Sequence, residues 1–232
     1  TVTSSSTTSP IEPMRTPEIA QVELAGLALE LAAWGESTLR FVDPPPTGAM
    51  AAARDLLQRL DALDAGHAIT ARGRRMLALG THPRLAAMLL ASTDPTRMAL
   101  ACDLAALVEA RDPLRSRSDA LAERWQALVA FRNGRVGADA NRSALAAIDA
   151  ASKQWRRRLR CDARPPASAP AHALGDLLAH AFPDRIARQH PQDPKRYLLA
   201  NGRMAKLFDD SAVHGEPWLV ASELRFETRD AL

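Results

Sequence analysis

The chain has 232 residues, of which 47% are hydrophobic and 25% charged, and its formal net charge is +3. This length suits one large domain or two to three small ones, with enough apolar residues for a real core. No apolar run is long enough to span a bilayer, and residues 1–10 lack the apolar segment of a signal peptide. Cys102 and Cys161 have no metal-ligand spacing, so we interpret them as reduced thiols of a cytoplasmic protein, with Cys102 in the core.

The charge is unevenly distributed along the chain. Residues 1–150 carry a net charge of −1, residues 151–206 a net charge of +8, and residues 207–232 a net charge of −4. A basic block in a nearly neutral chain indicates a phosphate-facing surface. The alternative is a solvated face in an arginine-rich proteome, since 27 of the 30 cations are arginine.

Residues 70–90 predict two short helices that meet at a fixed corner. Thr70 is a helix N-cap, and Gly80 ends that helix because glycine readily adopts the left-handed conformation. Pro83 forces His82 out of helix and can occupy the first turn of the next one, whose apolar face is Leu85, Met88 and Leu89. The corner separates one small unit from another, and His82 is interpreted as structural.

Before the corner, the Ser/Thr-rich residues 1–16 are expected to be disordered. Apolar stripes then predict one helix that ends at Gly35 and a second one from Met50 to Leu60. Residues 62–69 are compatible with a short hairpin. Helix, helix, hairpin and helix indicate a winged-helix domain at residues 17–83.

After the corner, residues 84–163 are predicted to be purely helical. Three apolar stripes are separated by turn signals at residues 94–95, 112–113 and 133–134, which indicates a small antiparallel bundle. The last stripe contains Leu145, Ile148, Ser152, Trp155 and Leu159. We expect these units to be complete without residues 164–232.

The remaining residues predict a linker and a small β segment. Residues 164–170 are Pro-rich, a helix spans 173–181, and three strands lie at 197–200, 204–207 and 218–221. A tight turn at Asn201 and Gly202 joins the first two strands.

An ordered set of motifs resembles the region after the motor in DEAH/RHA-type helicases, in particular the bacterial HrpB-type branch. The set covers roughly residues 14–226 and comprises Thr70-x-x-Gly73-Arg74-x-Met76, His82-Pro83-Arg84-Leu85, Met88-Leu89-Leu90 and the segments 17–19, 42–46, 109–115, 182–187, 196–203 and 217–220.

The resemblance implies a mainly α fold in which a winged helix relays motor motion and residues 84–163 form a helical ratchet domain that guides a single strand. It also implies an oligonucleotide-binding (OB) barrel at 164–232. A barrel of this type needs five strands and we find three, so we expect an incomplete domain and a fragment of a longer protein.

No ATP-hydrolysing site is evident in the chain. A helicase motor needs a GxxxxGK[ST] loop, and no lysine follows a glycine here. The resemblance implies that the motor domains, with their ATP and Mg²⁺, lie upstream. We therefore predict no catalytic residue, no metal site and no cofactor in this chain, and no ATPase activity of its own.

The candidate nucleic-acid-binding residues lie in two basic sets. In the run 153–160, Lys153, Arg157 and Arg160 have helical spacing and are expected to share one exposed face, with Arg156 beside them and Trp155 and Leu159 facing the core. They would grip phosphates of single-stranded RNA, or alternatively offset the negative end of the helix dipole. The second set, on the β segment, comprises Arg185, Arg188, Lys195, Arg196 and Arg203.

Tyr197 lies within the second set and either stacks on a base or fills the strand core. The alternative to nucleic-acid binding is a helical adaptor that binds protein partners through apolar faces and strand edges.

Overall fold

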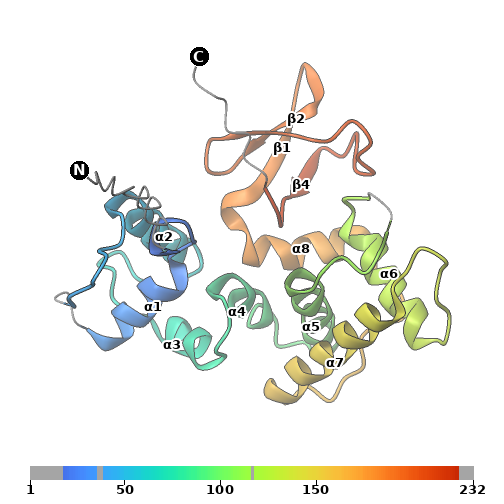
Figure 1. Cartoon of the computed structure of the whole chain (residues 1–232), viewed down its shortest axis with the longest axis horizontal. Helices are drawn as coiled ribbons and strands as arrows, with labels where there is room; N and C mark the ends of the chain where they lie inside the picture. Colours follow the sequence, from blue (N-terminus) through green and yellow to red (C-terminus); the bar gives the residue numbers. More distant parts are fainter. Residues whose placement is uncertain (1–17, 36–38, 116–117, 225–232) are drawn as a thin grey trace, which may run out of the picture.

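The computed structural model describes residues 18–35, 39–115 and 118–224, so the expected disorder of residues 1–16 lies outside the described part. The described residues form eight α-helices and one four-stranded antiparallel sheet (Figure 1). A short 3-10 helix, Glu18–Ala20, precedes the helices α1 (Ala25–Trp34), α2 (Thr47–Arg59), α3 (Ala71–Ala78), α4 (Pro83–Leu89), α5 (Pro95–Glu109), α6 (Leu121–Arg132), α7 (Arg142–Arg158) and α8 (Ala171–Ala181). A second 3-10 helix, Pro183–Arg185, leads into the strands β1 (Ile186–His190), β2 (Asp193–Leu199), β3 (Met204–Lys206) and β4 (Trp218–Val220).

Buried residues form three clusters. The first is built mainly by α1 to α3, the second by α4 to α8, and a small third one lies within the sheet. Helix α4 lies between the first two clusters, at the centre of Figure 1, and all of its residues are buried. Leu85, Met88 and Leu89 face the second cluster as predicted, while Ala86 and Ala87 complete the first.

The corner between α3 and α4 is formed by the residues that predicted it. The Thr70 hydroxyl accepts a hydrogen bond from the Gly73 amide at 2.9 Å, and Gly80 has a φ of 59°. Pro83 begins α4, and His82 Nδ1 accepts from the Arg84 amide at 3.3 Å. A Cβ atom on Gly73 would collide with the Ala62 carbonyl oxygen, so any side chain at this position would force the Ala62 backbone to move.

The predicted hairpin at residues 62–69 is reduced to a single bridge. Leu63 pairs with Ile69 in antiparallel fashion, and neither belongs to a strand. The Asp64 carboxylate instead accepts hydrogen bonds from the Gly66 and Ala68 amides, each at 2.9 Å. The Asp64 side chain thus provides hydrogen-bond acceptors for the amides of the turn, and no further strand pairing is needed.

The bundle is larger than predicted. Leu145, Ile148, Ser152 and Trp155 are buried as expected, but Leu174, Leu177 and Leu178 of α8 belong to the same cluster as α4 to α7. The expectation that the bundle is complete without residues 164–232 is therefore wrong. The Pro-rich segment returns the chain so that α8 packs on α4 and α5.

The sheet has four strands in the order β3-β2-β1-β4, so one of them was missed in the sequence. Strand β1 carries Arg188, Gln189 and His190, which hide the apolar alternation, and its pairing with β2 is irregular between Gln189 and His190. Strand β2 also begins at Asp193, earlier than predicted. The predicted turn is present, with Gly202 at a φ of 82°.

One buried arginine links the N-terminal helices, the bundle and the turn before the sheet. The Arg84 guanidinium, at the start of α4, donates to both oxygens of Glu23 at 3.2 Å and to Asp184 at 2.6 and 3.1 Å. His82 also contacts Glu23, at 3.2 Å, and Arg185 lies 3.5 Å from it. We call these five residues the Arg84 joint.

Within the Arg84 joint, hydrogen bonds shift the pKa values of Glu23 and Arg84 more strongly than burial does. Burial alone would raise the pKa of Glu23, but hydrogen bonds from His82 and Arg84 lower it from 4.5 to about 2. Burial would likewise lower the pKa of Arg84, and its bonds to Asp184 and Glu23 raise it instead. The N-terminal helices, the bundle and the segment before the sheet are thus held together by ionised groups.

Candidate nucleic-acid interface

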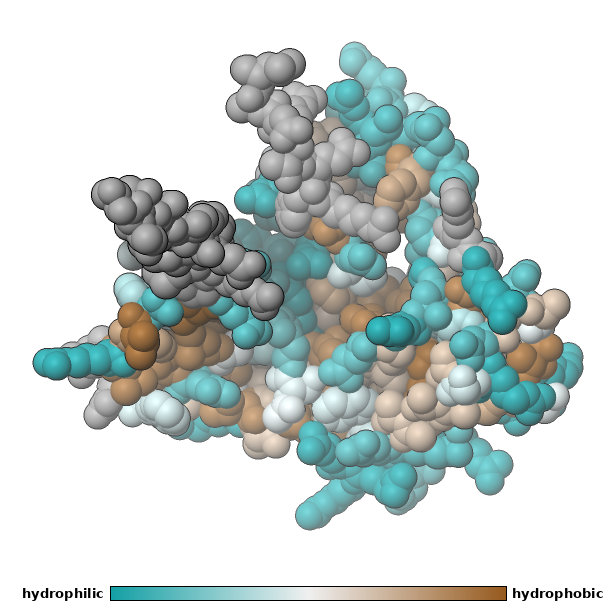
Figure 2. All heavy atoms as spheres, viewed as in Figure 1, coloured by the Kyte–Doolittle hydropathy of each residue, from teal (hydrophilic) through white to brown (hydrophobic). Residues whose placement is uncertain are grey.

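The basic run 153–160 lies at the C-terminal end of α7. Asn141 caps the start of this helix by accepting from the Ser143 and Ala144 amides at 3.0 and 3.1 Å. Trp155 packs inward with 9% of its surface exposed, and Lys153, Arg157 and Arg158 are exposed around it. In Figure 2 hydrophilic side chains project along the lower edge of the molecule, where Figure 1 places α7.

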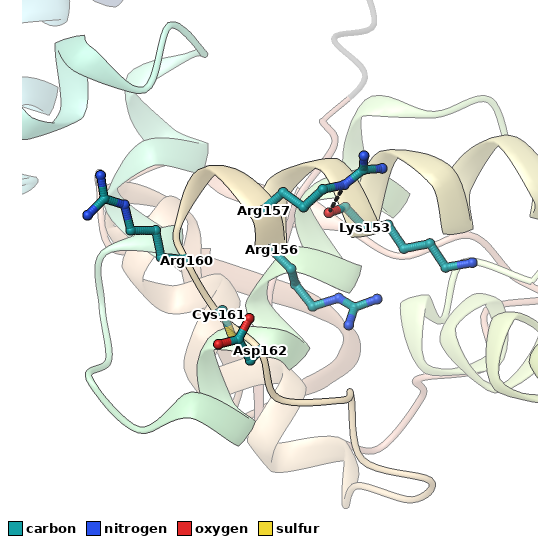
Figure 3. Close-up of a pocket in the computed structure, with 6 residues that line it drawn as sticks. All are labelled: Lys153, Arg156, Arg157, Arg160, Cys161 and Asp162. Carbon is teal, nitrogen blue, oxygen red and sulfur yellow. Dashed lines mark hydrogen bonds between the residues drawn. The ribbon is translucent and has the colours of Figure 1, made fainter.

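Four cations line one open hollow at this end. Its volume is about 560 Å³, and Lys153, Arg156, Arg157 and Arg160 share its walls with Cys161 and Asp162 (Figure 3). The structure thus brings together the four cations that were named from the run 153–160. Its open shape and basic lining suit a solvated phosphate backbone.

The four cations are not equivalent. The Lys153 ammonium lies 2.7 Å from an Asp149 carboxylate oxygen, so its charge is already paired. Arg156 is half-buried, and one of its terminal nitrogens donates to the Ala163 carbonyl at 3.2 Å. Its Nε atom is buried and has no hydrogen-bond partner among the described residues. Arg157 is exposed, and its Nε atom donates to the Lys153 carbonyl at 3.4 Å.

Arg160 does not share the helix face predicted for it. Helix α7 ends at Arg158, and Arg160 has a left-handed φ of 52°, so helical spacing no longer sets its direction. Figure 3 shows the Arg160 side chain pointing away from the Arg157 guanidinium, on the opposite side of the turn. The cations hence form a curved rim and not a straight stripe.

A buried ion-pair network holds the helices beneath this rim. Asp103 on α5 is fully buried and receives two hydrogen bonds of 2.7 Å from Arg132 on α6, together with donors from Trp125 and Ser152. Arg132 also donates to Asp149 at 2.7 Å. Burial would raise the pKa of Asp149, but hydrogen bonds from Lys153 and Arg132 lower it. The network fixes α7 against α5 and α6.

The second predicted basic set is dispersed by the sheet. Arg185 turns inward to the Arg84 joint, where burial and the neighbouring Arg84 lower its pKa. Lys195 pairs with Asp209 at 2.8 Å and Arg196 with Asp193 at 3.2 Å. Arg188 and Arg203 are exposed, Arg188 on the central strand β1 and Arg203 after the turn.

Tyr197 cannot stack on a base in this structure. Only 1% of its surface is exposed, and its hydroxyl donates to the Glu216 carbonyl at 2.8 Å. The strand-core alternative is therefore the right one. The aromatic residue that the sheet does expose is Trp218, at 60%, and it was not among the predicted site residues. The exposed position of Trp218 could not be predicted, because its partner strand β1 was not recognised in the sequence.

The described part of the chain shows neither a membrane-crossing helix nor a metal centre. No helix there combines the length and the apolar character needed to cross a bilayer. Nor does any group of three or more His, Cys, Asp or Glu residues in the described ranges have an arrangement that could hold a metal ion.

Comparison with known proteins gives a consistent result. The chain is 38% identical over 208 residues to the ATP-dependent RNA helicase HrpB of Escherichia coli K12, an alignment that covers 88% of this chain and 23% of that helicase. The chain is HrpB-like. No family model matches it. The resemblance to the C-terminal region of a bacterial HrpB-type helicase, predicted from the sequence, is confirmed.

Two solved structures show that the HrpB-like chain shares its fold with part of HrpB. The crystal structure of the E. coli DExH-box NTPase HrpB matches with a TM-score of 0.74 and 35% identity over 93% of this chain. That of the E. coli DEAH/RHA helicase HrpB matches with a TM-score of 0.68 and 36% identity over 89%. The chain spans about a quarter of each of those proteins, 24% in both cases.

Proposed function

We propose that this chain is the nucleic-acid-binding part of an ATP-dependent, cytoplasmic RNA helicase of the HrpB type. In this proposal residues 17–83 are a winged-helix domain that relays the motion of upstream motor domains. Residues 84–163 are the helical ratchet domain that guides a single RNA strand, and residues 164–232 are a linker and a partial OB-like domain. The N-terminal cluster and the small cluster of the sheet support the first and last of these units, although α8 packs within the central cluster.

The basic rim at the end of α7 carries the proposal. Arg156, Arg157 and Arg160 approach one open hollow, and Asp162 is the only carboxylate among the residues that line it. Cations gathered around one hollow with a single carboxylate raise the local positive potential, which attracts an anion. A phosphate backbone would supply that anion and release its own counterions, which favours binding to any sequence.

ATP hydrolysis is not proposed for this chain. ATP and Mg²⁺ would act in the upstream motor domains, and the chain would grip the strand that those domains move. We therefore expect the purified chain to show no ATPase activity stimulated by nucleic acid. Turnover that co-elutes with the pure protein in a single chromatographic peak would contradict the proposal.

The binding role is tested by neutralising the exposed part of the rim. Changing Arg157 and Arg160 to Gln should weaken binding of a single-stranded RNA 12-mer by roughly tenfold, because about two phosphate contacts are lost. The loss should be equal for unrelated sequences. Lys153→Gln alone should have a small effect, since Asp149 already pairs with Lys153.

A matched control has the same change in net charge. Arg74 and Arg75 are exposed on α3 and do not line the hollow, so changing both to Gln should leave affinity nearly unchanged. Equal losses in the two double variants would indicate diffuse electrostatics and no defined grip.

A helical adaptor that binds proteins is the second candidate. The observation that favours it is the pair of sheet edges, since β3 and β4 are the outer strands of the described sheet and can accept a further strand. If neither double variant changes RNA binding and a stable protein partner is found at those edges, the adaptor becomes the better account.

A further inference from the structure

One row of side chains crosses the whole sheet on its outer face. Trp218 lies opposite Arg188, Arg188 opposite Leu198, and Leu198 opposite Met204, so the row passes through β4, β1, β2 and β3 in turn. Neighbouring strands are about 4.8 Å apart, which makes the row about 14 Å long. It presents one aromatic ring, one guanidinium and two flexible apolar side chains.

This row is exposed to an unusual degree for apolar residues. Trp218 is 60% exposed, and Leu198 and Met204 are each 49% exposed. The alternate residues, Ala187, Tyr197 and Leu199, fill the small core on the other face. The inner face is therefore packed, while the outer face keeps an apolar surface that the described residues do not bury.

Three cations lie on the same face of the sheet as the row. The Arg188 guanidinium lies 5.9 Å from the centre of the Trp218 ring. Arg196 and Lys206 oppose each other two positions beyond Leu198 and Met204, so they lie on the same face. The carboxylate that pairs with Arg196 is Asp193, at 3.2 Å. A matching ligand must hence bring flat apolar groups and negative charges together.

We propose that this outer sheet face is a base-stacking site for a single-stranded nucleic acid, with Trp218 as the platform and Arg188 as the cation at its edge. Every base has an apolar face, and the phosphates that join successive bases match Arg188, Arg196 and Lys206. A row of 14 Å suits two or three bases, as on other four-stranded sheets that bind RNA. This inference rests on the proposed function and adds a second, chemically different contact.

The two contacts differ in what they recognise. The rim at α7 would bind phosphates whatever the bases are. The Trp218 face would bind mainly by stacking on bases, with a smaller contribution from the phosphates. An abasic oligonucleotide has the same charge and length as its parent but nothing to stack. It therefore separates the two sites.

The test measures fluorescence anisotropy of a labelled single-stranded RNA 12-mer and of its abasic counterpart, with the full chain. Trp218→Ala should weaken binding of the base-containing strand by about tenfold, which lies within the stacking contribution of one or two bases. It should leave the abasic affinity unchanged, and Trp218→Phe should restore most of the loss. Trp34→Ala is the matched control, because Trp34 on α1 is 67% exposed and distant in the sequence.

The outcomes separate this inference from the proposed function. If Trp218→Ala binds the base-containing strand as tightly as the parent chain, the stacking site is wrong, and the exposed face is left to a protein partner. If Trp218→Ala weakens both strands equally, its role is electrostatic or structural and the inference is likewise overturned. If the unmodified chain binds neither strand, the proposed function itself fails, and the stacking site fails with it.

Discussion

Replacement of Arg84 by methionine should destabilise the whole chain. The side chain is buried, and methionine retains only an apolar stem while removing five hydrogen bonds to the carboxylates of Glu23 and Asp184. Two carboxylates would remain beside each other without their main partner. Removal of one member of a buried ion pair costs about 3–5 kcal/mol, and the partial exposure of Glu23 places the expected loss near 3 kcal/mol.

The same joint predicts a pH dependence. The folded-state pKa of Glu23 is about 2, below its ordinary value of 4.5, so the stabilisation is complete above pH 4.5 and is lost as the pH falls toward 2. The shift corresponds to about 3 kcal/mol before screening. Glu23 is 37% exposed, which reduces the expected contribution to about 1–2 kcal/mol.

Urea unfolding followed by circular dichroism measures both effects. At pH 7 the midpoint of Arg84→Met should fall, and Glu23→Gln should fall less. Between pH 4.5 and 2 the parent chain should lose stability more steeply than either variant. A loss below 1 kcal/mol for Arg84→Met at pH 7, or identical acid profiles for all three proteins, would refute the role given to the Arg84 joint.

Two further predictions concern packing. Leu104→Ala should lower the free energy of unfolding by about 2–5 kcal/mol, because Leu104 has no exposed surface, and a neutral result would mean that another residue fills this part of the core. Gly73→Ala should cost roughly 1–3 kcal/mol, because its Cβ would meet the Ala62 backbone and force it to move. Gly48→Ala in α2, where a Cβ meets nothing within 4 Å, is the control and should not destabilise.

Features set by neighbouring residues were predictable from the sequence. Thr70, Gly80 and Pro83 act through their own backbone geometry, and each takes the role that its type indicates. The apolar stripe of α7 was also recognisable, because helical periodicity is a property of one segment. Lys153, Arg156 and Arg157 were placed on α7 for the same reason, whereas Arg160 lies beyond the end of the helix.

Features that depend on distant partners were not predictable in this way. Arg84 meets Glu23 and Asp184 across 61 and 100 residues, and nothing local indicates which charges are buried together. Strand β1 was missed because its exposed face carries Arg188 and His190. Without β1 there was no register, so Trp218 and Leu198 could not be placed on one face. Arg160 left the predicted face because the helix ends two residues earlier.

The salt dependence of single-stranded RNA binding tests the central claim most directly. If the rim grips phosphates, a plot of log affinity against log salt should be linear with a negative slope. In the variant with Arg157 and Arg160 changed to Gln, that slope should be shallower by about 1.4, since each phosphate contact on a single strand contributes about 0.7. An affinity that does not change with salt, or a slope identical in the parent chain and the variant, would contradict a nucleic-acid-binding role for this HrpB-like chain.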